Sequence, residues 1–99
     1  MRIEIDDDGY PTEESMGDLM ACPDVKEALD AVAKYLEDCG YGSARIRHGV
    51  YRLATGGWSG CESVINGLPF LVRAMAWRSS HRGGLHIYAL PKFMDKPTP

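Results

Sequence analysis

Long apolar runs and paired cysteines are both missing from this chain. None of its 99 residues belongs to an apolar stretch near the roughly 18 residues that a membrane-spanning helix requires, and the first residues form no secretory signal. The three cysteines, Cys22, Cys39 and Cys61, are an odd number without the C-x-x-C spacing of metal sites. Free thiols are typical of a reducing compartment, so we expect a cytoplasmic protein that does not act at a membrane.

Basic residues are scarce in the first forty positions, and acidic residues are scarce in the rest. Residues 1–40 hold 12 of the 14 acidic residues and only three basic ones, whereas residues 41–99 hold eight basic residues and two acidic ones. The acidic lobe is either a solvated face or a docking surface for a basic partner, such as one that normally holds nucleic acid. The candidate docking residues are Asp6, Asp7, Asp8, Glu13 and Glu14. Because the basic residues are scattered along the sequence, direct binding of nucleic acid is disfavoured.

One amphipathic helix is the clearest predicted element. Asp24 can cap it, with Glu27 three residues later, and apolar side chains recur at helical spacing as far as Cys39. Gly40 or Gly42 is expected to end it. We therefore expect residues 24–39 to form a helix that faces the core.

Shorter segments complete a single α+β domain over residues 1–99. The pattern predicts strands at 1–5, 70–78 and 85–90, a helix at 61–66 and a polar turn at 79–84. Residues 10–22 are expected to form a loop or a short helical turn, and residues 43–54 a bent strand or a small hairpin. The fold class is α+β, with a largely antiparallel sheet covered by one long amphipathic helix and a short helix after a Gly-rich turn. Residues 1–22 form an acidic N-terminal segment, and residues 92–99 a tail that frays.

The Gly-rich turn at residues 55–62, Thr-Gly-Gly-Trp-Ser-Gly-Cys-Glu, is the most informative local feature. Ser59 and Glu62 have the spacing of a capping box, and amides that converge at a helix start favour an anion or a carboxylate of a partner. The turn does not match three known motifs. It lacks the Lys-Ser/Thr pair of a P-loop and the glycine spacing of a dinucleotide-binding fingerprint, and it is one residue short of the G-x-S-x-G elbow that presents a nucleophilic serine. The candidate ligand or partner residues are Gly56, Gly57, Trp58, Ser59, Gly60, Glu62 and Arg82.

Catalytic and metal-binding patterns are incomplete. Cys61 lies in a predicted first helical turn, but His48, His81 and His86 are not placed beside it by local spacing. The acidic residues before Gly9 partly match a calcium loop whose twelfth position would be Ser15 in place of Glu. We predict no catalytic set, no cofactor and no metal, although a minor enzymatic role stays open.

The two tryptophans have different predicted roles. Trp77 is expected to pack in the core. Trp58 is expected either to close the core or to act, beside Arg82, as an exposed binding anchor.

The turn and the segment that follows it resemble a group of small phage-encoded proteins of uncharacterised function. Those proteins share a Thr-Gly-Gly-Trp-Ser-Gly-Asn-Glu turn, a tryptophan equivalent to Trp77 and an Arg-Gly-Gly-His hairpin, over roughly residues 50–90 of this chain. This chain departs at Cys61, Leu85 and Ala89, where Asn, His and an acidic residue are expected. The resemblance implies a phage origin and a fold more than an activity, and the departures argue against cysteine or histidine chemistry as the shared function.

Two functions remain as expectations. The first is a non-catalytic phage accessory protein that binds a host protein or complex in the host cytosol, in the manner of anti-CRISPR inhibitors, and that can form a homodimer. The second is a small anion- or nucleotide-binding domain, or a minor enzyme, which uses the Gly-rich turn and Arg82.

Overall fold

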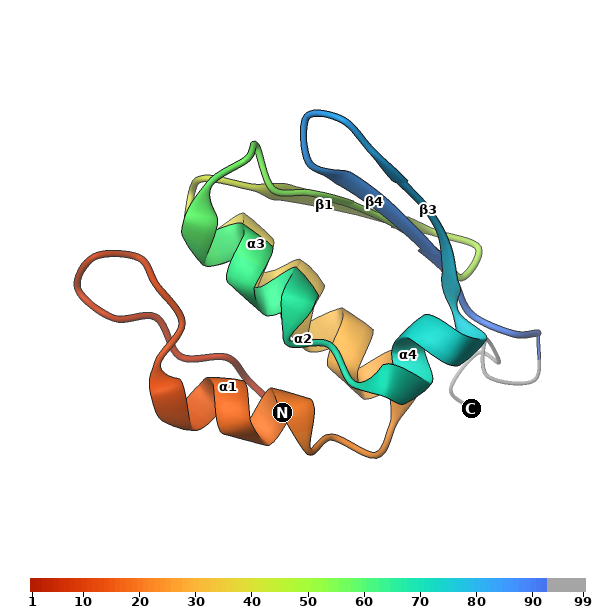
Figure 1. The fold of residues 1–99 in the computed structure, drawn as a ribbon, viewed down its shortest axis with the longest axis horizontal. Helices are drawn as coiled ribbons and strands as arrows, with labels where there is room; N and C mark the ends of the chain where they lie inside the picture. Colours follow the sequence, from red (N-terminus) through yellow and green to blue (C-terminus); the bar gives the residue numbers. More distant parts are fainter. Residues whose placement is uncertain (93–99) are drawn as a thin grey trace.

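The structure is a computed structural model that describes residues 1–92, and it confirms a single small α+β domain (Figure 1). One antiparallel sheet lies on one side, and the helices lie on the other. The helices are α1 (Glu13–Met20), α2 (Val25–Asp38), α3 (Ser59–Asn66) and α4 (Phe70–Met75), and the strands are β1 (Ser43–Arg47), β2 (Val50–Ala54), β3 (Trp77–His81) and β4 (Leu85–Ala89). Three of these helices are short, so the helical layer contains more elements than the two that the sequence predicts.

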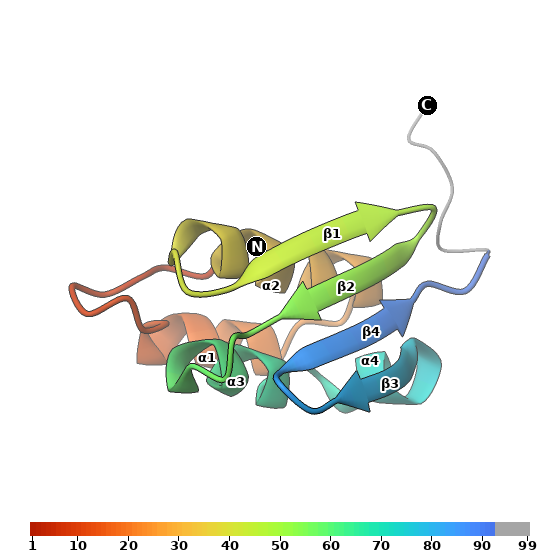
Figure 2. The ribbon, with the colours of Figure 1, turned by 90° about the horizontal axis from the view of Figure 1, so that it is seen from above.

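The strand order in the sheet is β1-β2-β4-β3, with antiparallel pairs throughout (Figure 2). Residues 43–54 form a hairpin, one of the two predicted alternatives. Its turn places His48 at φ 52° and Gly49 at φ 76°, the left-handed angles that tight two-residue hairpin turns require. The second hairpin brings β3 back against β4 with His81 opposite Leu85 and Ser80 opposite His86.

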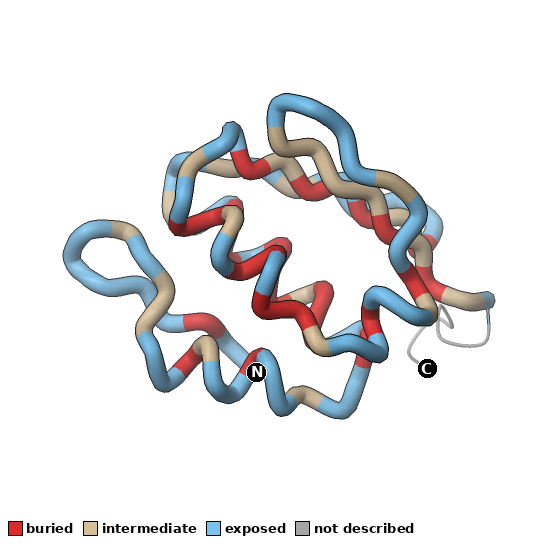
Figure 3. Tube along the Cα trace, viewed as in Figure 1, coloured by how far each residue is buried: buried red, intermediate tan, exposed pale blue. Residues whose placement is uncertain are grey.

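Helix α2 forms as predicted and contributes one side of the core. The Asp24 side chain accepts a hydrogen bond from the amide of Glu27 at 2.9 Å, and Gly40 follows the helix at φ +83°. The buried residues line the space between helices and sheet (Figure 3). Those with the largest fully buried side chains include Leu29, Val32, Tyr35 and Leu36 of α2, Tyr51 and Leu53 of β2, Val64 of α3, Val72 of α4 and Tyr88 of β4.

The N-terminal segment differs from the prediction. Residues 1–5 form no regular strand; Ile5 makes only an isolated bridge with Pro11, while Ile3 is buried in the core. Helix α1 begins at Glu13 and is longer than the short turn expected. Thr12 caps this helix by accepting a hydrogen bond from the amide of Ser15. Periodicity did not show this helix because only two of its residues, Ser15 and Leu19, are buried.

The predicted strand over residues 70–78 is wrong for most of its length, because Phe70–Met75 form helix α4 after Pro69, and only Trp77 and Arg78 belong to a strand, β3. The buried residues Val72 and Ala76 stand four apart, a helical spacing, whereas Phe70 remains 82% exposed. The predicted polar turn at 79–84 is also too long, since Ser79 to His81 belong to β3 and only residues 82–84 turn. The tail predicted at 92–99 lies outside the described residues except for Lys92.

Candidate functional site

The Gly-rich turn holds Trp58 in an aromatic cluster that the sequence did not predict. Tyr41 stacks on the Trp58 ring with centroids 4.2 Å apart, and Tyr10 contacts it at 4.7 Å. Gly56 and Gly57 have φ of +64° and +77°, as expected for a turn after a strand. Trp58 is half-buried, and Tyr10 and Tyr41 are 38% and 56% exposed, so the cluster forms part of the surface.

The capping box predicted for Ser59 and Glu62 is absent, because the N-cap of helix α3 lies one residue before Ser59. Trp58 is the N-cap residue and makes no side-chain capping bond. The Ser59 hydroxyl instead hydrogen-bonds the Tyr10 hydroxyl at 2.7 Å. The Glu62 carboxylate accepts from the Thr55 hydroxyl at 2.8 Å and therefore faces the strand end instead of the helix start.

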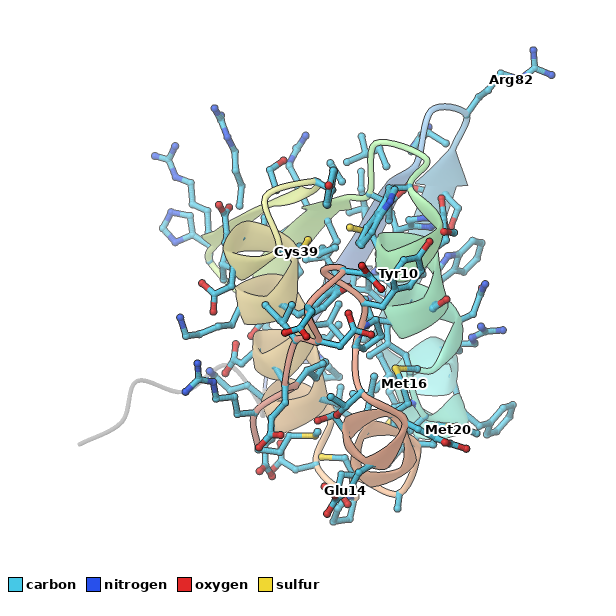
Figure 4. All side chains as sticks on the ribbon, turned by 90° about the vertical axis from the view of Figure 1, so that its left-hand side faces the viewer. Tyr10, Glu14, Met16, Met20, Cys39 and Arg82 are labelled. Atoms are coloured by element: carbon cyan, nitrogen blue, oxygen red, sulfur yellow. The ribbon has the colours of Figure 1, made fainter. Side chains whose placement is uncertain are left out.

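The structure does not bring Arg82 to the amides of the turn. Arg82 is at the tip of the β3–β4 hairpin and points away from the body of the protein (Figure 4). The Gly57 amide donates to the Thr55 hydroxyl at 3.1 Å, and the Trp58 amide donates to the Thr55 carbonyl at 3.2 Å. With these amides engaged and the Glu62 carboxylate nearby, the turn offers little to an anion.

The acidic loop before α1 is held rigidly beside the aromatic cluster. Asp6 Oδ1 accepts from the amides of Asp8 and Tyr10, both at 2.9 Å, and the Tyr35 hydroxyl donates to the Gly9 carbonyl at 2.7 Å. A Cβ atom at Gly9 would be 3.3 Å from the Trp58 ring. Asp6 is therefore a structural residue, and the loop presents the exposed Asp7 and Asp8 next to Tyr10.

Glu13 and Glu14 lie on α1 instead of in the acidic loop, and Glu14 lies away from Tyr10. Both are exposed in the first turn of α1, where acidic side chains favour the helix dipole. Figure 4 shows Tyr10 over α3 and Glu14 at the far side of α1. Within residues 1–92, no ion pair involves Asp7, Asp8, Glu13 or Glu14.

Three arginines lie on the face of the sheet that no helix covers, although they are scattered in the sequence. Arg45 is directly opposite Arg52, and Arg47 is two residues from Arg45 on the same face. No acidic side chain pairs with these arginines among the residues that the structure describes. The strand register places no Phe, Tyr or Trp on this face, so it lacks the stacking platform of most single-stranded nucleic-acid binders.

A chain of polar contacts joins the turn to the β3–β4 hairpin, and within it His86 Nε2 is buried without a hydrogen-bond partner. Thr55 Oγ1 contacts Glu62 at 2.8 Å and the Gly84 carbonyl at 3.3 Å, and Glu62 Oε2 lies 3.4 Å from His86 Nε2. His86 Nδ1 lies 2.9 Å from Ser80 Oγ. Residues 55–62 and 77–86, the two segments that carry the phage-protein resemblance, thus meet in one network.

Trp77 belongs to this network, and its predicted place in the core is wrong. The side chain is 47% exposed, and its ring N–H donates to Ser80 Oγ at 3.0 Å. Sequence reasoning also missed Tyr10, Tyr41 and Ser80. The Arg-Gly-Gly turn was the available signal for Ser80, because a three-residue loop at 82–84 places Ser80 opposite His86.

Two hollows open on the described surface. One of about 350 Å³ lies between α3, α4 and the β3–β4 hairpin and is lined by Asn66, Arg73, Trp77, Ser80, His86 and Tyr88 together with Ile65. The other, of about 800 Å³, lies between the N-terminal residues and α2. In the second hollow Lys26 pairs with Asp30 and the N-terminal amine pairs with Glu27, so these charges neutralise each other.

Cys61 is an inert thiol in this fold. It is fully buried, and its Sγ lies 3.6 Å from Cys39 Sγ. Burial, with a hydrogen bond to Cys39, raises the pKa of the Cys61 thiol to about 12. None of the three histidines hydrogen-bonds Cys61 in the described part of the chain, so the arrangement does not support a cysteine nucleophile.

Residues 1–92 contain no group of three or more metal-ligating side chains. No helix in the same range is long and apolar enough to cross a bilayer. No family model matches the chain, and comparisons with curated proteins and with solved structures yield no significant match.

Proposed function

We propose that this protein is a binding module that docks on a basic protein surface through Asp7, Asp8 and the Tyr10–Trp58–Tyr41 cluster. The observation that carries the proposal is the contact between the acidic loop and the cluster. Aromatic side chains with a polar edge dominate the energy of many protein interfaces, and adjacent carboxylates add attraction to a basic partner.

The rigidity of the loop supports this function. The Asp6 carboxylate, the Tyr35 hydroxyl and the Tyr10–Ser59 hydrogen bond hold the loop from three sides. A surface that is already ordered loses less conformational entropy when a partner binds, so more of the contact energy appears as affinity.

A host defence complex that normally holds nucleic acid has the basic surface that such a module needs. The phage resemblance makes a complex of this kind our proposed partner, with the module acting as an inhibitor. The alternative, a small-anion site at the Gly-rich turn, receives less support because Arg82 points away and the Gly57 and Trp58 amides are engaged.

Partner capture from host lysate tests the proposal. The amount of partner retained is compared between the wild type, variants of the proposed surface and a charge-matched control. The double variant Asp7→Asn, Asp8→Asn should retain the partner at least about tenfold less well than the wild type, because two interface charges typically contribute about 1.4 kcal/mol or more together. When Tyr41→Ala is added to the double variant, retention of the partner should weaken further. For the purified partner, the association rate should fall as salt rises, because the Debye length shrinks to about 8 Å at physiological ionic strength.

The matched control is Asp18→Asn, Asp38→Asn, which changes the net charge equally. Asp18 lies in the second turn of α1, and Asp38 lies at the end of α2. This control should bind as the wild type does. Equal weakening in both double variants would show that net charge alone drives retention and would overturn the proposed docking surface.

A further inference from the structure

The hydrogen-bond directions around Ser80 follow from the donors and acceptors present. His86 Nε2 is buried without a hydrogen-bond partner and lies 3.4 Å from Glu62 Oε2, so we assign the ring proton to the nitrogen that faces this acceptor, which leaves Nδ1 as an acceptor. Ser80 Oγ already accepts from the Trp77 ring at 3.0 Å. Its own proton therefore points to His86 Nδ1, 2.9 Å away.

This arrangement activates the serine oxygen. A base that receives the hydroxyl proton and a carboxylate behind that base are the parts that serine nucleophiles use. Ser80 still has one free lone pair for attack, and Trp77 stabilises negative charge on Oγ. The Glu62–His86 contact of 3.4 Å is not aligned as a hydrogen bond, and catalytic hydrogen bonds are often long or poorly aligned before a substrate is bound.

A substrate can reach Ser80 through the hollow of about 350 Å³ beside the hairpin, and the lining of this hollow includes a positive charge. Ser80 is exposed at its wall, and the half-exposed Trp77 ring lies beside it. Arg73 lines the same hollow, and within residues 1–92 its one polar contact is a long one, 3.5 Å to the Asn66 carbonyl. A cation in this position favours a substrate with a negative group.

We propose that Ser80, His86 and Glu62 form a hydrolytic site for small esters that carry a negative charge. Ser80 Oγ attacks the acyl carbon and forms a C–O bond while its proton passes to His86 Nδ1. The bond to the leaving alcohol then breaks, and His86 returns the proton to that alcohol. Water hydrolyses the acyl-enzyme by the same path and restores the Ser80 hydroxyl.

Glu62 is a positioning residue in this scheme. Its carboxylate faces His86 Nε2 and so favours the tautomer in which Nδ1 accepts, and Thr55 fixes the carboxylate from the other side. Glu62→Gln keeps an oxygen for Thr55 but loses the acceptor-only character that His86 requires.

A fluorophosphonate probe, which reacts with activated serines, tests the site directly on the full chain. Mass spectrometry should locate the label on Ser80, and His86→Gln should slow labelling about a hundredfold or more. Glu62→Gln should slow labelling at an unchanged melting temperature and should shift the imidazole ¹⁵N signals of His86 away from the Nε2–H tautomer. p-Nitrophenyl hemisuccinate should be hydrolysed faster than p-nitrophenyl acetate, and Arg73→Ala should remove that preference.

Ser79 provides the matched control within the same strand. Its hydroxyl lies 2.9 Å from His81 Nε2, but no ion pair connects His81 to a carboxylate in residues 1–92. Ser79→Ala should leave labelling unchanged. A Ser80 labelling rate equal to that of Ser79, or one that His86→Gln does not lower in a folded variant, would overturn the proposal.

Discussion

Gly60 illustrates how one residue controls the aromatic surface. A Cβ atom on Gly60 would lie 2.2 Å from Trp58 Cζ3 and 2.5 Å from Cη2, so the indole ring rests directly on the helix backbone. The ring is fixed on its other sides by Tyr10 and Tyr41. Helix α3 therefore has a glycine in its first turn because Trp58 occupies the space of a side chain.

We expect Gly60→Ala to lower the free energy of unfolding by about 1–3 kcal/mol, because the new methyl group must displace the ring. Gly17→Ala is the matched control, since nothing lies within 4 Å of its Cβ position in α1. That change should raise stability by about 0.5–1 kcal/mol through helix propensity. Urea unfolding measures both values, and a stabilising effect from Gly60→Ala would show that the ring is free to move.

At the scale of elements, α2 and α4 show where periodicity succeeds and where it fails. Helix α2 has 14 residues and a continuous buried face, so its period is evident in the sequence. Helix α4 has six residues and one buried side chain, Val72. Its sequence, Phe-Leu-Val-Arg-Ala-Met, is too short to distinguish a helix from a strand.

The buried face of α2 leads to a direct prediction. Leu29 and Leu36 are fully buried, so replacing either with alanine should lower the free energy of unfolding by about 2–5 kcal/mol through the cavity that remains. Lys34 is exposed, and its one ion pair within residues 1–92 is with Asp38 on the same helix. Lys34→Ala should therefore change stability by no more than about 0.5 kcal/mol. Similar losses at all three positions in equilibrium denaturation would contradict the assigned face.

At the scale of the whole molecule, the acidic loop and three arginines of the sheet lie on opposite sides of the fold. The acidic loop and α1 lie on the helical side, whereas Arg45, Arg47 and Arg52 lie on the uncovered sheet face. Arg45 and Arg52 are cross-strand neighbours of like charge, an arrangement that costs stability. A homodimer remains a prediction, and contact between these unlike faces would join copies head to tail instead of closing a symmetric pair.

Buried thiol and tyrosine hydroxyl groups make the stability of the fold sensitive to alkaline pH. Burial raises the pKa of Cys61 to about 12 from 9.0, and burial also raises the pKa of Tyr35 and Tyr88, with Arg73 opposing the shift at Tyr88. These groups ionise first in the unfolded chain, so the stability that their burial contributes should be fully present below about pH 9 and should be lost from there toward pH 12. Urea unfolding between pH 7 and 11 measures this loss.

The variant Cys61→Ala isolates the contribution of the thiol. This substitution removes the thiol, whose unperturbed pKa is 9.0. The free energy of unfolding of the variant should therefore fall less steeply between pH 9 and 10 than that of the wild type. An equal slope would mean that the Cys61 thiol is not held neutral by burial.

The sequence alone determined those features that depend on neighbouring residues. The Asp24 cap, the long apolar stripe of α2, the positive φ angles at Gly56 and Gly57 and the α+β class follow from local sterics and short-range periodicity. Tertiary structure alone decided the roles of Ser59, Trp77, Ser80 and Arg82. Ser59 meets Tyr10 across 49 positions, and His86 of β4 lies 3.4 Å from Glu62 of α3. Such contacts depend on how elements pack, and no local pattern encodes which distant side chain will complete a hydrogen bond.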